Sequence, residues 1–300
     1  MNGLVLEALR KLTRGEVRLQ EPMARHTSLR IGGPADVFVV PRDKEDSAQI
    51  VEWLQSRAIP HFILGRGTNI LVGDAGIRGV VVAIQDSLEY LHIEGARVTV
   101  GAGYSLPKLV LECLRRGLGG IEGLGGVPGS VGGAVIMNAG AYGVELFDYL
   151  LHVELIQEGR RQIRRREQVR YGYRYTDLRG ALVLEAVLEL PAVDPEQALR
   201  RRQELLARRN ATQPLELPNA GSVFKNPPGE YAGRLIEAAG LKGFRIGGAM
   251  VSDKHANFLV NTGSATAQDM RRLIEHVRQV VQERFGVELE LEIELVGEGF

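Results

Sequence analysis

The sequence predicts an α+β or α/β fold in more than one domain. Short apolar runs alternate with helix-like patterns through the first two thirds of the chain, an order that neither a helix bundle nor a β-sandwich would show. At 300 residues the chain exceeds one small core and indicates two or three domains. Its apolar share of 44% and charged share of 25% are ordinary for a soluble globular protein.

Helices and strands follow from the hydrophobic period and the boundary residues. Met1–Arg14 lacks the charged-then-apolar order of a signal peptide and is expected to form a short amphipathic helix. Further helices are expected at Lys44–Arg57, Ser105–Arg116 with Ser105 as N-cap, Pro195–Asn210, Ala232–Ala239 and Thr266–Phe285. Strands are expected at Val37–Val40, Phe62–Leu64, Gly79–Ile84, Arg97–Val100, Leu151–Gln157, Leu182–Leu190 and Val287–Val296. A change of composition places a domain boundary near 200–212.

Residues 117–143 interrupt this order with 11 glycines in 27 positions. So much glycine weakens regular elements, and such a segment usually lets backbone approach another group closely. A flexible linker is the alternative, but linkers rarely carry apolar residues such as Ile121, Leu124 and Val135 among their glycines. The segment therefore favours a ligand-cradling loop.

Two further glycine segments are candidate phosphate cradles. Residues 65–69 follow an apolar strand, and their successive N–H groups can form an anion-binding nest. This loop lacks both the ending of a P-loop and the immediate helix of a Rossmann fingerprint. The second segment is Ile31–Pro34. Ordinary tight turns explain each segment equally well when it is taken singly, whereas the three together favour a dinucleotide cofactor held by several loops.

Several other chemistries lack support. The formal net charge is zero, and the arginine-rich runs Gly159–Arg170 and Arg200–Arg209 carry no interleaved aromatic residues, which favours solvated faces over a nucleic-acid surface. The six histidines show no metal-ligand spacing, so no metal site is expected. Cys113 is the single cysteine, and its apolar helical surroundings predict a buried thiol in a reducing cytoplasm. No stretch reaches the roughly 20 apolar residues of a membrane span.

An ordered set of motifs resembles the UDP-N-acetylenolpyruvoylglucosamine reductase (MurB) family. The motifs are HTSLRIGGPAD (26–36), LGRGTN (64–69), VPGSVGGA (127–134), NAGAYG (138–143), YRY (173–175), NAGSVFKNP (219–227), GGA (247–249) with KHAN (254–257), and LELE (289–292). They run in family order from about residue 25 to 297 and cover nearly the whole chain. Each motif alone is weak, whereas the ordered set is highly specific.

The resemblance implies a vanillyl-alcohol-oxidase or PCMH-type flavoprotein. Two subdomains, residues 1–90 and 91–200, would hold FAD without a covalent link, and residues 205–300 would form an α+β substrate domain, with the alternative that its last strand returns to the FAD domain. NADPH would be the co-substrate in the reduction of UDP-N-acetylglucosamine enolpyruvate to UDP-N-acetylmuramate, a step of peptidoglycan synthesis that serves cell-wall formation, cell shape and cell division. The short spacing between Tyr175 and Ser222 resembles the subtype without an inserted tyrosine-bearing loop.

The resemblance also implies three catalytic residues. Arg174 matches the arginine that stabilises negative charge developing next to the substrate carboxylate. Ser222 matches the proton donor, for which Lys225 or a water molecule would act as polarising neighbour. Glu292 matches the catalytic glutamate that stabilises or protonates the intermediate. From the residues alone, Glu292 would be one acid among several on a half-exposed strand.

Substrate and cofactor residues follow from the same motifs. Lys225 and Asn226 match positions near the substrate, and Tyr142 is assigned to its diphosphate or uracil side. The FAD pyrophosphate is expected against Gly65, Arg66, Gly67, Thr68 and Asn69 and beside Gly126, Pro128, Gly129, Ser130, Gly132, Gly133 and Ala134. Two positions depart from the family pattern: Leu291 stands where proline is usual, and Met250 stands where a polar residue is usual.

Other functions remain as alternatives. An FAD-dependent oxidase of the same superfamily, acting on an alcohol or a sugar, would share the first 190 residues but would not need the 219–227 motif or Glu292. A non-catalytic flavin- or nucleotide-binding module would not need Arg174, Ser222 and Glu292 together. An RNA-binding protein would rest on the arginine runs alone. The expected partners are small molecules, with no nucleic acid and no membrane, and the protein is expected to be monomeric and cytoplasmic.

Overall fold

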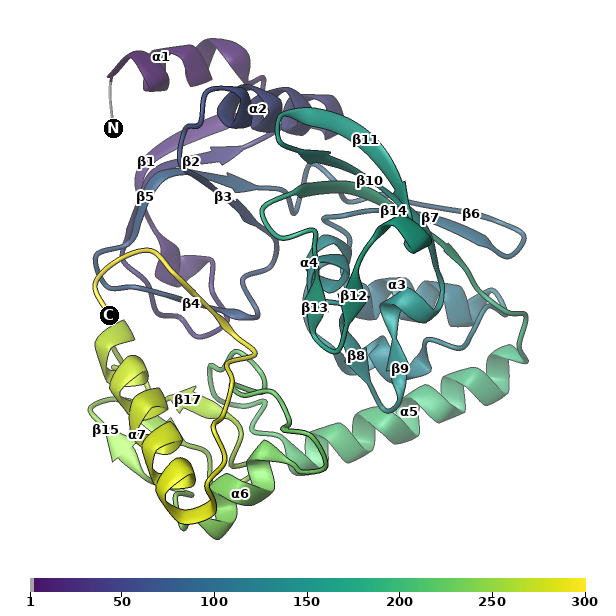
Figure 1. Ribbon diagram of the computed structural model, residues 1–300. Helices are drawn as coiled ribbons and strands as arrows, with labels where there is room; N and C mark the ends of the chain where they lie inside the picture. The colour runs from purple at the N-terminus through teal and green to yellow at the C-terminus, as the bar shows by residue number, and fades with distance from the viewer. Residues whose placement is uncertain (1–2) are drawn as a thin grey trace. The chain divides into compact units, whose positions relative to one another are not determined.

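The computed structural model describes residues 3–300 and divides into two compact units (Figure 1). The first unit is formed by the described part of Met1–Gln20, by Asp36–Arg66 and by Gly79–Arg208. The second unit is formed by Glu21–Ala35, Gly67–Arg78 and Arg209–Phe300. Each unit has a hydrophobic core of its own.

Two sheets form most of the first unit. The four-stranded sheet has the order β1 (Glu16–Pro22), β2 (Pro34–Val40), β5 (Ile77–Ala83) and β3 (His61–Leu64). The five-stranded sheet has the order β11 (Arg160–Arg165), β10 (Leu150–Gln157), β14 (Leu182–Glu189), β7 (Arg97–Gly101) and β6 (Leu91–Glu94). Strands β3 and β5 are parallel, and the neighbours within the five-stranded sheet are antiparallel.

Helices cover both faces of the five-stranded sheet. Helix α2 (Lys44–Ser56) contacts β10 and β14, and α4 (Val131–Ile136) contacts β14 and β7. Figure 1 shows the two helices on opposite sides of these strands. Strand β14 is accordingly buried at nearly every position, as expected for a strand covered twice. The unit also contains α1 (Gly3–Leu12), α3 (Leu106–Arg115), most of α5 (Pro195–Thr212), and the hairpins β8–β9 (Gly140–Ala141, Val144–Glu145) and β12–β13 (Tyr171–Gly172, Tyr175–Thr176).

The second unit is a smaller α+β assembly. The antiparallel sheet β15 (Arg245–Ile246), β16 (Ala249–Val251) and β17 (Leu259–Asn261) is covered by α7 (Ala267–Phe285), which also contacts α6 (Ala232–Ala238). Strands β4 (Ile70–Val72) and β18 (Glu294–Val296) pair in parallel. Helix α7 begins with a capping box at Thr266 and Asp269 and ends at Gly286 in the left-handed conformation.

The predicted helices are confirmed to within two residues at their ends. The first two positions of the predicted N-terminal helix lie outside the described residues, and Gly3–Leu12 is helical. Ser105 is the N-cap of α3, although its side chain makes no capping hydrogen bond. Cys113 is fully buried, as predicted. The predicted strands are also observed, with one exception.

The exception is the closing strand, which was expected over Val287–Val296 but covers only Glu294–Val296. The preceding residues instead pair with another segment: Lys225 N donates to Glu290 O at 2.9 Å, and Glu292 N donates to Val223 O at 2.8 Å. The chain then changes partner and joins β4. The alternation of polar and apolar residues indicates an extended segment, but it does not reveal that this segment changes its pairing partner.

The glycine-rich segment is also more regular than the sequence suggests. It was expected to be a loop, but it contains the 3-10 helix Glu122–Gly126 and the helix α4. Ser130 caps α4 by accepting a hydrogen bond from Gly133 N at 3.3 Å. Close packing of Gly132 against Ala102 supports the helix from the side. Tertiary contact therefore outweighs the low helix propensity of glycine here.

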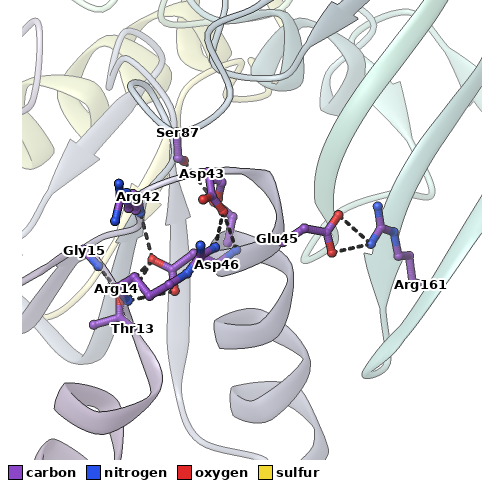
Figure 2. A network of polar contacts seen from close by, with 10 residues as sticks. Thr13, Arg14, Gly15, Arg42, Asp43, Glu45, Asp46, Ser87 and Arg161 are labelled. Atoms are coloured by element: carbon purple, nitrogen blue, oxygen red, sulfur yellow. Dashed lines mark hydrogen bonds and ion pairs between the residues drawn. The ribbon is translucent and has the colours of Figure 1, made fainter.

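A buried carboxylate in the first turn of α2 holds the turn between α1 and β1 (Figure 2). Asp46 is fully buried and accepts hydrogen bonds from Thr13 Oγ1 at 2.9 Å, Arg42 N at 2.8 Å and Arg14 N at 3.1 Å. It lies in the first turn of α2, where a negative charge is stabilised by the helix dipole. These contacts satisfy a charge that would otherwise be costly to bury.

Candidate functional site

Two of the glycine segments predicted to hold a cofactor lie side by side in the first unit. A Cβ atom at Gly65, directly after β3, would lie 2.4 Å from Ser130 Oγ. Gly129 has φ of +139°, which L side chains rarely adopt. A side chain at Gly65 would therefore displace the Ser130 hydroxyl, which caps α4, so glycine at Gly65 lets the two segments touch.

The glycines of α4 differ in what surrounds them. Gly132 N donates to Ala102 O at 2.8 Å, and a Cβ at Gly132 would lie 2.8 Å from Ala102 Cβ. A Cβ at Gly133 would meet only Ser130 Oγ, at an ordinary 3.5 Å. Gly132 is therefore explained by packing within the protein. Gly133 is not, and its missing side chain leaves room for a bound group.

Arg66 supplies a hydrogen-bond donor beside this cradle. Its Nε atom is buried and has no acceptor among residues 3–300. A buried donor without an acceptor costs about 1–3 kcal/mol. A phosphate oxygen would satisfy it through a strong charge-assisted hydrogen bond. The residues present thus fit an anionic group such as the FAD pyrophosphate.

The rest of the 65–69 loop belongs to the second unit. Gly67 has φ of +60°, and a Cβ there would lie 2.0 Å from His26 O. Ser28 N donates to Gly67 O at 2.9 Å, and Ser28 Oγ donates to Asn219 O at 2.6 Å. Ser28 therefore joins three of the motifs: its own, the 64–69 loop and the segment that carries Ser222.

Arg174 projects from the turn of the β12–β13 hairpin in the first unit. Its Nη2 donates to Gly140 O at 2.6 Å, its Nη1 lies 3.9 Å from Glu145 Oε1, and the guanidinium lies 4.9 Å from the Tyr173 ring centroid. The side chain is 16% exposed. Its φ of +54° is in the left-handed region, which costs a non-glycine residue about 1–2 kcal/mol. Such strain is often retained where a side chain must be aimed for function.

The Arg174 hairpin is anchored to α4, the helix that includes the end of the 126–134 segment. Thr176 Oγ1 donates to Ile136 O, in the last turn of α4, at 2.5 Å. The fully buried Asn138 donates from Nδ2 to Gly172 O at 3.1 Å and to Glu145 Oε2 at 2.8 Å. The 126–134 segment, α4 and the hairpin therefore form one continuous hydrogen-bonded arrangement within the first unit.

Tyr142 occupies the tip of the β8–β9 hairpin. It has φ of +54° and is 42% exposed, and its hydroxyl donates to Leu205 O in α5 at 3.3 Å. An exposed aromatic ring in a strained turn is available to a ligand. No contact of Tyr142 assigns it to the diphosphate or to the base.

Ser222 and Glu292 are carried by neighbouring backbone segments of the second unit. The bond from Glu292 N to Val223 O and the bond from Lys225 N to Glu290 O make these segments antiparallel. Both Ser222 and Glu292 are half-buried. The structure thus places side by side the backbone segments that carry two predicted catalytic residues distant in the sequence. The third, Arg174, belongs to the other unit.

Two predicted substrate residues, Lys225 and Asn226, follow Ser222 in the chain and have protein partners. Lys225 Nζ lies 3.3 Å from Glu290 Oε2, whose side chain is 74% exposed. Such an exposed ion pair contributes little stability and can exchange for a ligand. Asn226 is exposed, and its Oδ1 accepts a hydrogen bond from Ala232 N, at the start of α6, at 3.1 Å.

Asn257 is a residue near the site to which the sequence assigned no role. It is 3% exposed and holds the backbone beyond Ser222 with three hydrogen bonds: Val223 N to Asn257 O at 2.9 Å, Phe224 N to Oδ1 at 3.0 Å, and Nδ2 to Phe224 O at 2.8 Å. The KHAN motif contained this residue, but only its burial and partners show what it does. Beside it, burial lowers the pKa of His255, whose Nδ1 accepts a hydrogen bond from Asn257 N.

The two departures from the family pattern have structural explanations. Leu291 pairs with Phe224, but the hydrogen bonds on either side are made by Glu292 N and Lys225 N. The Leu291 amide is not part of this ladder, which explains how either proline or leucine is accommodated. Met250 is 7% exposed in β16, and its Sδ accepts a hydrogen bond from Arg245 Nε at 3.0 Å.

Within residues 3–300, no cluster of three or more His, Cys, Asp or Glu side chains is arranged to hold a metal ion. None of the helices between residues 3 and 300 is long and apolar enough to cross a membrane. His26, next to the 64–69 loop, is paired with Glu21 at 2.8 Å.

Comparison with known protein families gives two matches. Residues 35–163 match the family described as FAD binding domain, and residues 213–296 match the C-terminal domain of UDP-N-acetylenolpyruvoylglucosamine reductase. The reductase of that name from Chloroherpeton thalassium is 47% identical over 298 residues, covering 96% of this chain and 96% of its own.

Solved structures give the same result. The UDP-N-acetylenolpyruvylglucosamine reductase (MurB) from Thermus caldophilus is 39% identical, with a TM-score of 0.80 over 94% of this chain and 99% of its own. An alkyldihydroxyacetonephosphate synthase is only 14% identical, with a TM-score of 0.50 over 64% of this chain and 41% of its own, and shares the fold alone. The predicted vanillyl-alcohol-oxidase-type FAD-binding fold with a C-terminal α+β domain is confirmed.

Proposed function

The chain belongs to the UDP-N-acetylenolpyruvoylglucosamine reductase family, and on this premise we propose that it reduces UDP-N-acetylglucosamine enolpyruvate to UDP-N-acetylmuramate with NADPH, a step of peptidoglycan synthesis. The observation that carries the proposal is the pairing of the Ser222 and Glu292 segments within the second unit. An oxidase of the same superfamily has no need of this pair, and the family matches favour the reductase.

The reaction adds a hydride and a proton across a carbon–carbon double bond. When bound, FAD supplies hydride transfer from NADPH to the terminal methylene carbon of the enolpyruvyl group. NADPH is thereby oxidised to NADP⁺, and the double bond becomes a lactyl ether once the carbon next to the carboxylate gains a proton. The protein must stabilise negative charge at that carboxylate and deliver the proton.

Arg174 is proposed to stabilise the charge. Its guanidinium is held by Gly140 O and lies near Glu145, so its orientation is fixed before substrate binds. A guanidinium can bind a carboxylate with two parallel hydrogen bonds. Pre-arranged donors of this kind lower the barrier because they need no reorganisation as charge develops.

Ser222 and Glu292 are proposed to deliver and support the proton. A serine hydroxyl is a poor acid alone, and the Lys225 ammonium, three residues along the chain, is proposed to polarise it. Glu292 is proposed to assist from the adjacent backbone segment. Lys225, Asn226 and Tyr142 are proposed to bind substrate.

The cofactor is proposed to lie against residues 65–68, the backbone of Asn69 and residues 126–134. Support comes from the contact of Gly65 with Ser130, from the open space at Gly133 and from the unsatisfied Nε of Arg66. In domain terms, we propose residues 1–90 and 91–200 as FAD-binding subdomains and 205–300 as the substrate domain. The protein is proposed to act as a cytoplasmic monomer, with a role in cell shape and division that follows from peptidoglycan synthesis.

The decisive experiment follows NADPH oxidation by the purified, FAD-loaded protein without oxygen. Oxidation should require UDP-N-acetylglucosamine enolpyruvate and yield UDP-N-acetylmuramate, identified by mass. A flavin-loaded protein that ignores this substrate but oxidises an alcohol or sugar with oxygen would identify an oxidase instead. Ser222→Ala should bind FAD and lose product formation, and unchanged turnover would remove Ser222 from the mechanism. Light scattering during size-exclusion chromatography measures the molar mass and tests whether the protein is a monomer.

A further inference from the structure

Asn69 lies in the loop assigned to the cofactor, yet its observed contacts are with the backbone around Glu292. Asn69 Nδ2 donates to Glu292 O at 3.0 Å. The backbone of the same residue accepts a hydrogen bond from Glu294 N at 2.9 Å. All of these atoms belong to the second unit.

These contacts complete the support of Glu292. Its N–H is bonded to Val223 O at 2.8 Å, on the segment that carries Ser222, and its carbonyl is bonded to the Asn69 side chain. The backbone of Glu292 is thus held on both sides. Glu292 also lies where the chain leaves its pairing with residues 223–225 and joins β4, a change of partner that no regular ladder stabilises.

We propose that Asn69 is a positioning residue for Glu292, and that its side chain acts in the protonation of substrate rather than in holding FAD. This inference rests on the proposed function, because Glu292 has its role only in that reaction. The side-chain amide fixes the Glu292 peptide, which sets where the carboxyl group stands. A displacement of about 1 Å in such a group can reduce a catalysed rate by about 100-fold.

The two possible roles of Asn69 affect different half-reactions. A residue that holds FAD influences both the bleaching of the flavin by NADPH and the recovery of its colour on addition of the enolpyruvyl substrate. A residue that acts through Glu292 influences only the recovery, because protonation occurs there. Stopped-flow absorbance without oxygen measures the two rates separately.

The test uses Asn69→Ala and the isosteric Asn69→Asp, neither of which can donate from an amide. The recovery rate should fall about 10- to 100-fold, whereas the bleaching rate and the FAD dissociation constant should change less than about threefold. Asn261→Ala is the control, because its buried side chain also bonds to backbone, at Leu29 O, Gly263 N and Ala265 N, and none of these bonds is to Glu292. It should leave the ratio of the two rates unchanged. Weaker FAD binding with equal slowing of both steps would overturn the proposal.

A double-mutant cycle tests whether Asn69 acts through Glu292. In a Glu292→Gln background, Asn69→Ala should slow the recovery by less than about twofold further, because coupled residues are not additive. Full additivity would contradict the proposal. Hydrogen exchange of residues 290–296 in the apoprotein should also be faster in Asn69→Ala, a readout independent of activity. If the unmodified protein fails to reduce the substrate, the proposed function fails, and exchange at these amides still reports on the contact.

Discussion

Replacing Asn257 with alanine would remove a side chain that bonds both polar groups of the Phe224 backbone. The side chain accepts from Phe224 N at 3.0 Å and donates to Phe224 O at 2.8 Å, and Asn257 is 3% exposed. Each buried backbone group left without a partner costs about 1–3 kcal/mol. The bond from Val223 N to Asn257 O involves backbone only and is retained. We therefore expect Asn257→Ala to lower the free energy of unfolding by about 2–4 kcal/mol.

An aspartate at this position would make the loss depend on pH. Asn257→Asp keeps an acceptor for Phe224 N, but an ionised carboxylate cannot donate to Phe224 O. Burial and the facing carbonyl would raise the pKa of the new carboxyl group in the folded state above its unfolded value of about 3.9. A protonated carboxyl can donate, so its stabilising contribution is full below the unfolded pKa and is lost as pH rises through the folded pKa. The free energy of unfolding of Asn257→Asp should therefore be closer to that of the unmodified protein at pH 5 than at pH 8.

Urea unfolding followed by far-UV circular dichroism measures both effects. Circular dichroism is chosen because the single tryptophan, Trp53, lies in the first unit, whereas Asn257 lies in the second. A free energy of unfolding for Asn257→Ala within about 0.5 kcal/mol of that of the unmodified protein would refute this prediction. A difference for Asn257→Asp that did not change between pH 5 and pH 8 would also contradict it.

Four further predictions address the proposed cofactor cradle, the proposed role of Arg174 and the core. Arg174→Lys should reduce kcat about 100-fold. The control Arg170→Lys changes a side chain that is 83% exposed and should alter kcat little. Equal reductions of kcat in the two variants would refute a special role for Arg174. Gly133→Ala should weaken FAD binding while stabilising the apoprotein by about 0.5–1 kcal/mol, because glycine disfavours a helix; unchanged affinity would place FAD elsewhere. Burial raises the pKa of Cys113 to about 12. The folded protein should therefore not react with a thiol-specific disulfide reagent at pH 8. Rapid labelling of Cys113 would contradict this, because it would show that the thiol is accessible. Asp46→Ala should lower the unfolding free energy by about 2–4 kcal/mol, because three donors lose their acceptor; a loss below about 0.5 kcal/mol in urea would contradict this.

Local sequence signals were sufficient for most of the helices. Helix α7 has its start encoded at Thr266 and Asp269 and its end at Gly286, all within a few residues of the helix itself. The burial of Cys113 followed in the same way from the apolar face of α3. The ordered motifs likewise indicated the family, because they preserve residue types and spacing along nearly the whole chain.

Elements whose stability comes from remote partners were predicted less well. Helix α4 forms in spite of its glycines because Gly132 packs closely on Ala102. The segment before β18 is divided because it pairs first with residues 223–225 and then with β4. Neither partner is near in sequence, and periodicity carries no information about which segment will be adjacent.

By itself, the sequence determined the family, the cofactor class and most of the helices, because these depend on residue types at fixed spacing. Only the tertiary structure decided that Asn69 bonds to Glu292, that Asn257 holds Phe224 and that Arg174 has a positive φ. These features arise from hydrogen bonds between segments 33 and 223 residues apart and from backbone strain that the surrounding hairpin imposes. A hydrogen bond depends on atoms meeting at about 3 Å, and that meeting is set by how the chain packs rather than by the order of its residues.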